Sequence, residues 1–289
     1  PAPDQPVWIR CRVISSRPMR AVTLFYKDES AAVYSPVEMK DDGLGGDEQA
    51  GDGIYGGVIP GYANGQIIEY YLGAVDEDGQ EGLFPVEGPA KSAIYLADET
   101  AYATSLPLYR IVMRRKDDRI LRSRNVTSNE ELPATFIAGG DVYYNVGVRF
   151  RGKGSRYAEP KSYRVDFTRS RHFGTVRKLN LNAVNPDRQF VGLECFRLLR
   201  MPAPVMNFVS LAFNQTFVPN YIQVERLDRY AMERLFGDGD GNLYRGIEQA
   251  NFDYRGEDPN PYKPHYMKIT NELQNDYTDI VDLSRAFSA

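Results

Sequence analysis

The sequence predicts a multi-domain protein, in which an all-β sandwich precedes a larger α+β domain. Its 289 residues reach the length at which chains usually divide into more than one core. Residues 1–97 hold short runs of strand-forming residues at roughly ten-residue spacing, the pattern of a β-sandwich. The polar stretch 98–107 contains a proline and has little periodicity, so it predicts the linker. Residues 108–289 mix strand and helix patterns and form the second predicted domain.

The composition is that of an ordinary globular protein, with 42% hydrophobic and 26% charged residues. A net charge of −4 argues against binding of a nucleic-acid backbone, which normally needs a basic domain. No apolar run approaches the ~20 residues that cross a bilayer, and the first residues lack the plan of a signal peptide. Cys11 and Cys195 lie in different predicted domains, so we expect no disulfide, and we expect Cys195 to be buried in a helix.

Alternation of aromatic and β-branched residues between turn clusters predicts the strands of the first domain. They are Val7–Ile14, Arg20–Tyr26, Ala32–Met39, Ile54–Ile59, Ile67–Asp76 and Ser92–Leu96. The loop 41–52 carries five acidic residues among four glycines, which would suit calcium. It lacks the D-x-[DN]-x-[DN]-G order of a calcium loop, and a solvated hairpin loop is the simpler interpretation. We therefore predict no metal site.

The second domain begins with a strand predicted at Leu108–Met113. The charged residues 114–136 are expected to form a surface excursion, with a possible helix start at Ser128. The seven basic residues in the range 110–124 could attract an acidic partner, although neighbouring aspartates dilute their charge.

A basic loop then joins two strands predicted at Val142–Phe150 and Ser162–Phe167. The loop begins with Arg151-Gly152-Lys153-Gly154-Ser155-Arg156, and Lys161 opens the returning strand. Glycines let backbone amides approach an anion closely, and the cationic side chains and the hydroxyl add donors, so this hairpin could hold phosphate. The alternative is an ordinary solvated turn, because short glycine motifs often occur without a ligand.

Periodicity and caps predict the elements that follow the hairpin. The strands are Lys178–Ala183, Asn207–Phe213, Val218–Arg226 and Asn242–Ile247, and the helices are one that Asp187 caps and that ends before Pro202, Arg229–Phe236, and Asp276–Phe287. The first helix is expected to have a broad apolar face, and Gly237 is expected to end the second. Residues 237–242 begin like a calcium loop, but Leu243 stands where such a loop needs glycine, so no metal is expected there.

Several motifs occur in an order that resembles the CotH family, spore-coat-type proteins with an atypical protein kinase fold. The motifs are R-G-K-G-S-R and P-K-S-Y-R-V-D-F within 151–167, K-L-N-L-N-A at 178–183, Y-I-Q-V-E-R-L-D at 221–228, G-N-L-Y-R-G at 241–246 and Y-M-K-I-T-N-E at 266–272. The resemblance implies that residues 108–289 are the N-terminal part of a kinase-like domain, mainly its N lobe. The first domain resembles the Ig-like or fibronectin-type modules of secreted bacterial proteins, through residues 39–60 and 67–80.

The CotH resemblance also implies an ATP site. Lys161 would contact phosphate, and Glu194 would orient Lys161 through an ion pair. The implied phosphate cradle consists of Arg151, Gly152, Gly154, Ser155 and Arg156, and the implied adenine contacts are Glu225 and Arg226. Two alternatives stay open: Glu194 faces water and pairs with Arg197, and Glu225 forms a surface ion pair with Arg226 or Arg229.

By resemblance, the chain is a fragment of a CotH-like kinase that transfers phosphate from ATP to protein hydroxyls, at the cell envelope or outside the cell. Magnesium or manganese would assist, with ligands expected beyond residue 289, so we expect this fragment to be inactive alone. The expected partners are a protein substrate and, through the Ig-like module, a cell-wall or envelope component, without nucleic acid or a membrane span. One alternative is a noncatalytic envelope, adhesion or spore-coat-type binding protein. Another is a carbohydrate-binding β-sandwich that uses Trp8 and Tyr62.

Overall fold

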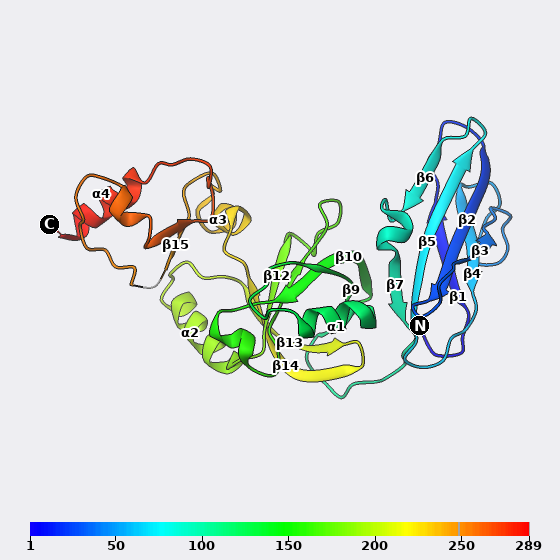
Figure 1. Cartoon of the computed structure of the whole chain (residues 1–289), viewed down its shortest axis with the longest axis horizontal. Coiled ribbons are helices and arrows are strands. Elements are labelled where there is room, and N and C mark those ends of the chain that lie inside the picture. Colours follow the sequence, from blue (N-terminus) through cyan, green and yellow to red (C-terminus); the bar gives the residue numbers. More distant parts are fainter. Residues whose placement is uncertain (248, 289) are drawn as a thin grey trace. The chain divides into compact units, whose positions relative to one another are not determined.

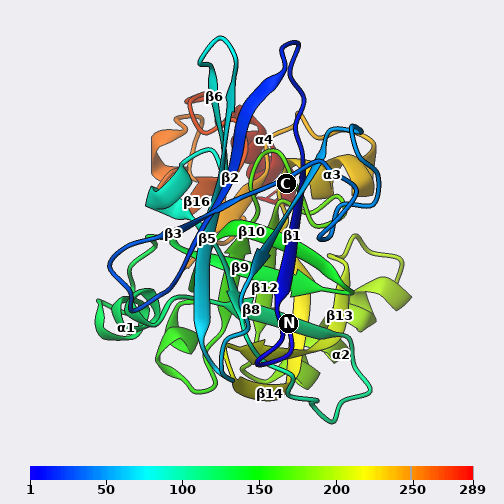
Figure 2. The ribbon, with the colours of Figure 1, turned by 90° about the vertical axis from the view of Figure 1, so that its right-hand side faces the viewer.

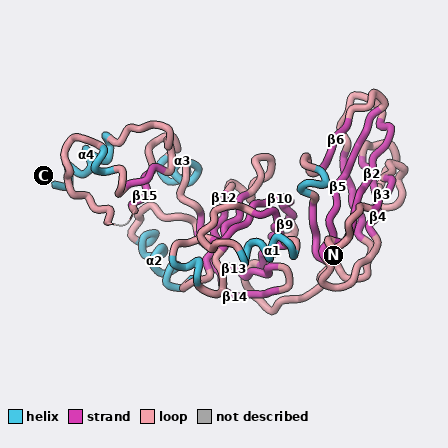
Figure 3. The backbone as a smooth tube through the Cα atoms, viewed as in Figure 1, coloured by secondary structure: helices cyan, strands magenta, loops and turns pink. Residues whose placement is uncertain are grey.

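The computed structural model describes residues 1–247 and 249–288, and the protein is mostly β, with several sheets and a few helices (Figure 1, Figure 3). The chain divides into two compact units. Unit 1 comprises Pro1–Val191 and Met206–Val224, and unit 2 comprises Gly192–Val205 and the residues from Glu225 onward. Unit 1 contains a first module, residues 1–97, and a closed barrel of later strands.

Two antiparallel sheets form the first module. The smaller sheet pairs β1 (Val7–Arg12) with β4 (Ile54–Ile59), and the five-stranded sheet contains β3 (Ser35–Glu38), β2 (Met19–Asp28), β5 (Ile67–Asp76), β6 (Glu81–Phe84) and β7 (Ala93–Leu96). Figure 2 faces this module, and β2 and β5 run side by side along it. Both sheets contribute to one core, in which Leu24, Ile59 and Ile68 are fully buried. The predicted strands are confirmed with shifted ends, whereas exposed β6 gave no alternating signal and was not predicted.

The barrel is a closed sheet in the order β10, β11, β12, β14, β13, β8 and β9. Its strands are β8 (Leu108–Val112), β9 (Leu132–Ala138), β10 (Asp141–Phe150), β11 (Tyr163–Asp166), β12 (Lys178–Asn182), β13 (Met206–Phe213) and β14 (Thr216–Glu225). Strand β13 is parallel to β8 and antiparallel to β14. Phe136, Val148 and Leu181 are fully buried in the barrel core, because alternate residues of each strand point inward. The predicted strands of the central hairpin are confirmed as β10 and β11.

Residues 114–136 are not a surface excursion, so this prediction was wrong. They include α1 (Arg115–Ser123), and their last residues enter the barrel as β9. Leu121 is fully buried and Asp117, about one turn earlier, is buried too, so α1 packs through one side although most of its residues are charged. Ser128 starts no helix, because its amide donates to the carbonyl of Asn125 in a turn.

The first module and the barrel share buried contacts within unit 1. Ile67 and Ile94 of the first module pack in one apolar cluster with Val112 of β8. Strand β10 is irregular between Tyr143 and Val146, and there Tyr144 reaches the core of the first module. The Tyr144 ring lies 6.0 Å from that of Tyr70 and 5.9 Å from that of Phe84, both edge to face.

The predicted linker is held against the barrel. Arg110 Nη1 donates to Asp98 Oδ2 at 2.9 Å, and Arg110 Nη2 donates to the carbonyl of Thr100 at 3.1 Å. The ring of Tyr102 stacks on that of Phe217 with centres 4.7 Å apart. Residues 98–107 therefore follow a fixed path in this structure, although their sequence has the composition of a flexible segment.

Unit 2 has small elements of both kinds. They are the end of α2 (Pro186–Leu198), α3 (Arg229–Phe236), the antiparallel pair β15 (Tyr244–Gly246) and β16 (Tyr266–Lys268), and α4 (Thr278–Ser288). Tyr262 and Ile280 lie in its core. Helix α3 has the bounds that the sequence predicts: Asp228 caps its start, and Gly237, with φ of 74°, ends it.

Helix α2 does not bury the apolar face that the sequence predicts. None of its residues is buried, and Cys195 is exposed, so the expectation of a buried Cys195 was wrong. At about 100° per residue, the apolar residues between Phe190 and Leu198 point all around the helix rather than to one side. Cys11 and Cys195 are both free thiols in this structure. Among the described residues, no helix is long and apolar enough to cross a membrane.

Candidate functional site

A cavity of about 390 Å³ lies beside the basic loop of the central hairpin. It is lined by Arg122, Val126, Phe150, Tyr157, Glu159 and Lys161. The first two come from α1 and the turn after it, Phe150 ends β10, and the other three belong to the loop that follows. The cavity therefore joins two cationic side chains, one carboxylate and an aromatic wall, in a volume that suits a small ligand.

Lys161 is held from several sides although it lines the cavity. Its Nζ donates to the carbonyl of Arg156 at 2.9 Å and lies 3.2 Å from Oε1 of Glu159. It also lies 5.4 Å from the centre of the Phe150 ring, a distance typical of a cation–π contact. The hydroxyl of Tyr221 donates to the carbonyl of Lys161 at 2.7 Å. The Lys161 side chain is only 15% exposed, whereas that of Glu159 is 69% exposed.

Arg122 supplies the second cation of the cavity. Its Nε donates to Oδ1 of Asp118 at 2.7 Å, and its guanidinium carbon lies 5.5 Å from the centre of the Phe213 ring. Burial lowers the pKa of Arg122, but Tyr163 and Asp118 together outweigh it, and the pKa is raised. Burial raises the pKa of Tyr163 to about 12, so its hydroxyl keeps its proton at neutral pH. Arg122 is therefore a fixed positive charge at the cavity wall.

Arg156, predicted to belong to a phosphate cradle, is buried and is 8% exposed. Its Nε donates to the carbonyl of Gly152 at 2.7 Å, and its Nη1 donates to the carbonyls of Val126 and Ser128 at 3.2 and 3.0 Å. Its Nη2 donates to Oδ1 of Asn129 at 2.6 Å. These acceptors are all neutral. Burial, and then the nearby Arg124, lower the pKa of Arg156.

The other predicted cradle residues form the turn of the hairpin. The Arg151 amide donates to the carbonyl of Ser162 at 3.0 Å, which closes the base of the loop. Gly152 has φ of 104°, which L side chains rarely adopt, and a Cβ there would clash with Oγ of Ser155. A Cβ on Gly154, at the start of the 3₁₀ turn Gly154–Tyr157, would meet no atom within 4 Å. The loop therefore requires glycine at position 152 only.

Three predicted site residues belong to unit 2: Glu194, Glu225 and Arg226. Arg197 Nε donates to Oε2 of Glu194 at 2.8 Å, and this hydrogen bond lowers the pKa of Glu194. Glu225 Oε2 accepts from the amide of Val205 at 2.9 Å and from Nη2 of Arg234 at 2.5 Å. The Glu194–Arg197 pair is the alternative that the sequence offered, whereas the pairing of Glu225 with Arg234 was not predicted. An ion pair between Glu194 and Lys161, and adenine contacts of Glu225 and Arg226, stay predictions.

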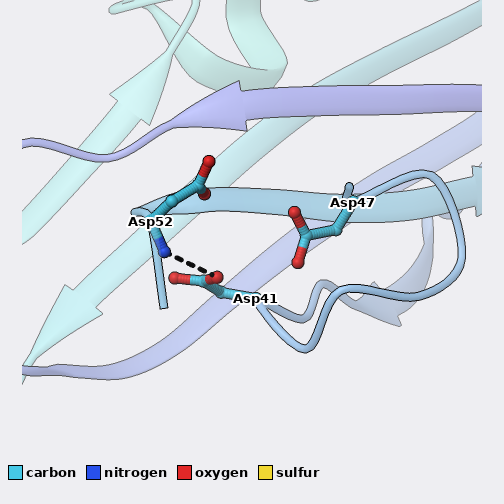
Figure 4. Close-up of side chains that lie close together, drawn as sticks. All are labelled: Asp41, Asp47 and Asp52. Carbon is cyan, nitrogen blue, oxygen red and sulfur yellow. Dashed lines mark hydrogen bonds between the residues drawn. The ribbon is translucent and has the colours of Figure 1, made fainter. Parts of the chain in front are cut away.

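Three aspartates of the acidic loop, Asp41, Asp47 and Asp52, lie close together (Figure 4). One carboxylate oxygen of each lies within 4.8 Å of the others. Asp41 and buried Asp47 both accept hydrogen bonds from the loop backbone. The donors are the amides of Gly43, Gln49, Gly51, Asp52 and Gly53. The carboxylates thus organise the loop themselves, and the absence of a metal here stays a prediction.

Of the residues that line the cavity, the sequence predicted only Lys161 as a site residue. The others are Arg122, Val126, Phe150, Tyr157 and Glu159. The basic segment 110–124 was noticed, but it was interpreted as a solvated surface. Its charge pattern does not tell which cation faces the hairpin. The packing of α1 through Leu121, which local pattern does not reveal, helps to place Arg122 beside the loop.

Residues 148–289 match the family model described as CotH kinase protein. The match supports the CotH family. The CotH match begins on β10, so it includes the basic loop and Lys161 but excludes the first module and Arg122. The cavity is therefore built partly from the CotH segment and partly from the residues that precede it.

Solved structures of the cycloalternan-degrading enzyme from Trueperella pyogenes are also similar to the chain. They are the enzyme itself, with a TM-score of 0.25, and its complexes with cycloalternan and isomaltose, with TM-scores of 0.25 and 0.24. Each is 10% identical and covers 78% of this chain, which spans 29%, 31% and 28% of those chains respectively. Similarity at this level carries no conclusion about function. No curated protein matches the chain.

Proposed function

We propose that the cavity binds the phosphates of ATP and that the chain is the nucleotide-binding part of a CotH-type protein kinase. The observation that carries this proposal is the placement of Arg122 and Lys161 on one cavity, next to the glycine-containing loop of the CotH segment. Phosphoryl transfer needs fixed cations beside the phosphates, because negative charge on them must be stabilised where it develops.

The residues at the cavity fit a phosphate group. Two cations outweigh the one carboxylate among the lining residues. Glu159 is largely exposed, so its carboxylate can turn to water when a phosphate takes its place beside Lys161. Phe150 and Tyr157 add apolar surface that suits the rest of a nucleotide. Magnesium or manganese would neutralise phosphate charge.

The wider role follows from the family. We propose that the full-length protein transfers phosphate from ATP to hydroxyl groups of proteins, at the cell envelope or outside the cell. The first module, with its two packed sheets, would then bind an envelope partner in the manner of an Ig-like module.

Calorimetric titration of this chain with ATP, tripolyphosphate and AMP tests the site. We expect ATP and tripolyphosphate to bind and AMP to bind much more weakly. Lys161→Ala and Arg122→Ala should each weaken binding about tenfold or more, since a hydrogen bond to a charged group contributes roughly 1.5–3 kcal/mol. Arg119→Ala is the matched control for Arg122→Ala, because Arg119 is an exposed cation on the same helix and does not line the cavity. Equal affinity of the wild type and both cavity variants would place any nucleotide elsewhere.

A second experiment tests catalysis. The full-length protein is incubated with labelled ATP, a protein acceptor and magnesium or manganese, beside a Lys161→Ala variant. Transfer that this substitution abolishes supports the kinase. Binding of ATP without transfer, from folded protein and with either metal, would favour the noncatalytic binding protein instead.

A further inference from the structure

Two walls of the cavity come from segments that are distant in sequence. Arg122 and Val126 belong to α1 and its following turn, whereas Lys161 belongs to the hairpin loop. The separation of the two cations therefore depends on what joins these segments.

Arg156 makes that connection, although it is not among the residues that line the cavity. Through Nε it holds the carbonyl of Gly152 in its own loop, and through Nη1 and Nη2 it holds Val126, Ser128 and Asn129 in the other segment. Its own carbonyl accepts from Nζ of Lys161 at 2.9 Å. The side chain of Arg156 thus holds the segment after α1, and its backbone carbonyl holds the Lys161 side chain.

The same contacts show that Arg156 does not face a ligand directly. Its guanidinium nitrogens are taken by protein acceptors, and the residue is buried. Because the planar guanidinium spreads its donors in a fixed fork, one side chain can bond to acceptors on both segments at once. A lysine would keep the charge but has a single nitrogen, so it cannot bridge the same set.

We propose that Arg156 is a positioning residue, which clamps the segment 126–129 to the hairpin loop and so sets the distance between Arg122 and Lys161. This inference rests on the proposed function, because it assigns a role at the same site. It differs from the phosphate contact that the sequence suggested for Arg156, since Arg156 acts here through Arg122 and Lys161.

Tripolyphosphate titration of Arg156→Lys separates the two roles. If Arg156 is a clamp, Arg156→Lys should bind tripolyphosphate about tenfold more weakly, because the charge is kept but the bridge between the two segments is lost. The control is Arg171→Lys, which changes an exposed arginine of unit 1 and should bind like the wild type. A direct electrostatic contact predicts that Arg156→Lys keeps most of the affinity, and that result would overturn the clamp. Asn129→Ala is a milder variant, which removes one acceptor and leaves Arg156 in place.

Hydrogen exchange of the ligand-free chain is the independent readout. Amides of residues 126–129 and 152–158 should exchange faster in Arg156→Lys and, to a smaller extent, in Asn129→Ala, while amides of the first module are unchanged. Unchanged exchange in both variants would overturn the clamp, whatever the ligand does. If amide exchange rises in the variants as expected but the wild type binds no polyphosphate, Arg156 does join the two segments and the proposed function is wrong.

Discussion

Nε of Arg114 lies 3.1 Å from Oε2 of Glu69, and both side chains are 4% exposed. Glu69 belongs to β5 of the first module, and Arg114 directly precedes α1 of the barrel. Ser92 joins the pair, since Arg114 Nη2 donates to its Oγ at 2.8 Å and this hydroxyl donates to Oε2 of Glu69 at 2.9 Å. A buried ion pair therefore connects the two parts of unit 1.

Glu69→Ala should destabilise unit 1 by up to about 3–5 kcal/mol, because it leaves buried Arg114 with only the longer ion pair to Asp117, at 3.5 Å. Urea unfolding followed by the fluorescence of Trp8, the single tryptophan, measures this. Glu48→Ala is the control: it breaks the exposed pair with Arg10, which is expected to contribute less than about 1 kcal/mol. Similar losses in the two variants would contradict a structural role for the buried pair.

Gly152→Ala should weaken tripolyphosphate binding about tenfold, because positive φ and the clash with Ser155 would reshape the loop, at a strain of roughly 1–3 kcal/mol. Gly154→Ala is the matched control two residues away, where a Cβ meets nothing. Calorimetry on both variants checks this. If Gly152→Ala and Gly154→Ala have the same affinity for tripolyphosphate, binding does not depend on the loop conformation that Gly152 allows.

Because the pKa of Tyr163 is raised to about 12, the stability of unit 1 should depend on pH in the alkaline range. The stability that the protonated Tyr163 contributes is fully present below pH 10, the ordinary pKa of tyrosine, and is lost as pH rises toward 12, because the unfolded chain releases this proton first. The wild type should therefore lose about 1.4 kcal/mol per pH unit relative to Tyr163→Phe in that window. Urea unfolding at several pH values measures the difference. Tyr157→Phe, with an exposed ring, is the control, and a constant difference between wild type and Tyr163→Phe would refute the expectation.

Asp228→Ala should loosen the start of α3, because the Asp228 carboxylate accepts from the amides of Tyr230 and Ala231. Loss of such a cap costs about 1 kcal/mol, and Asp228→Asn should retain most of it. Hydrogen exchange of the α3 amides reports the local change. Equal exchange in Asp228→Ala and wild type would show that other contacts hold this end.

Removal of calcium by a chelator should leave the unfolding midpoint of the first module unchanged. The reason is that Asp41 and Asp47 already accept hydrogen bonds from the loop backbone. Thermal unfolding with chelator and with added calcium checks this. A midpoint that calcium raises in the wild type but not in Asp47→Asn would instead establish a metal site.

The sequence predicted helices and strands better than it predicted contacts between residues that are distant in sequence. Strand alternation and the helix end at Gly237 depend on neighbouring residues, and those elements are confirmed. Within segment 114–136, the packing of α1 depends on one buried apolar residue, Leu121, among many charges, so the local pattern did not reveal it. The sequence did not show the contacts of Arg156 either, because the acceptors Val126, Ser128 and Asn129 are distant from it in sequence, and its place in a phosphate cradle stays a prediction.

Strand β10 has Tyr144 in the core of the first module near one end and Phe150 at the cavity at the other. A module on a flexible linker samples many orientations, and its cargo reaches a site only at the effective concentration that the linker allows. Here the shared strand and the buried contacts restrict that freedom. If the first module binds a partner as proposed, these contacts would limit the distances and orientations at which that partner meets the cavity.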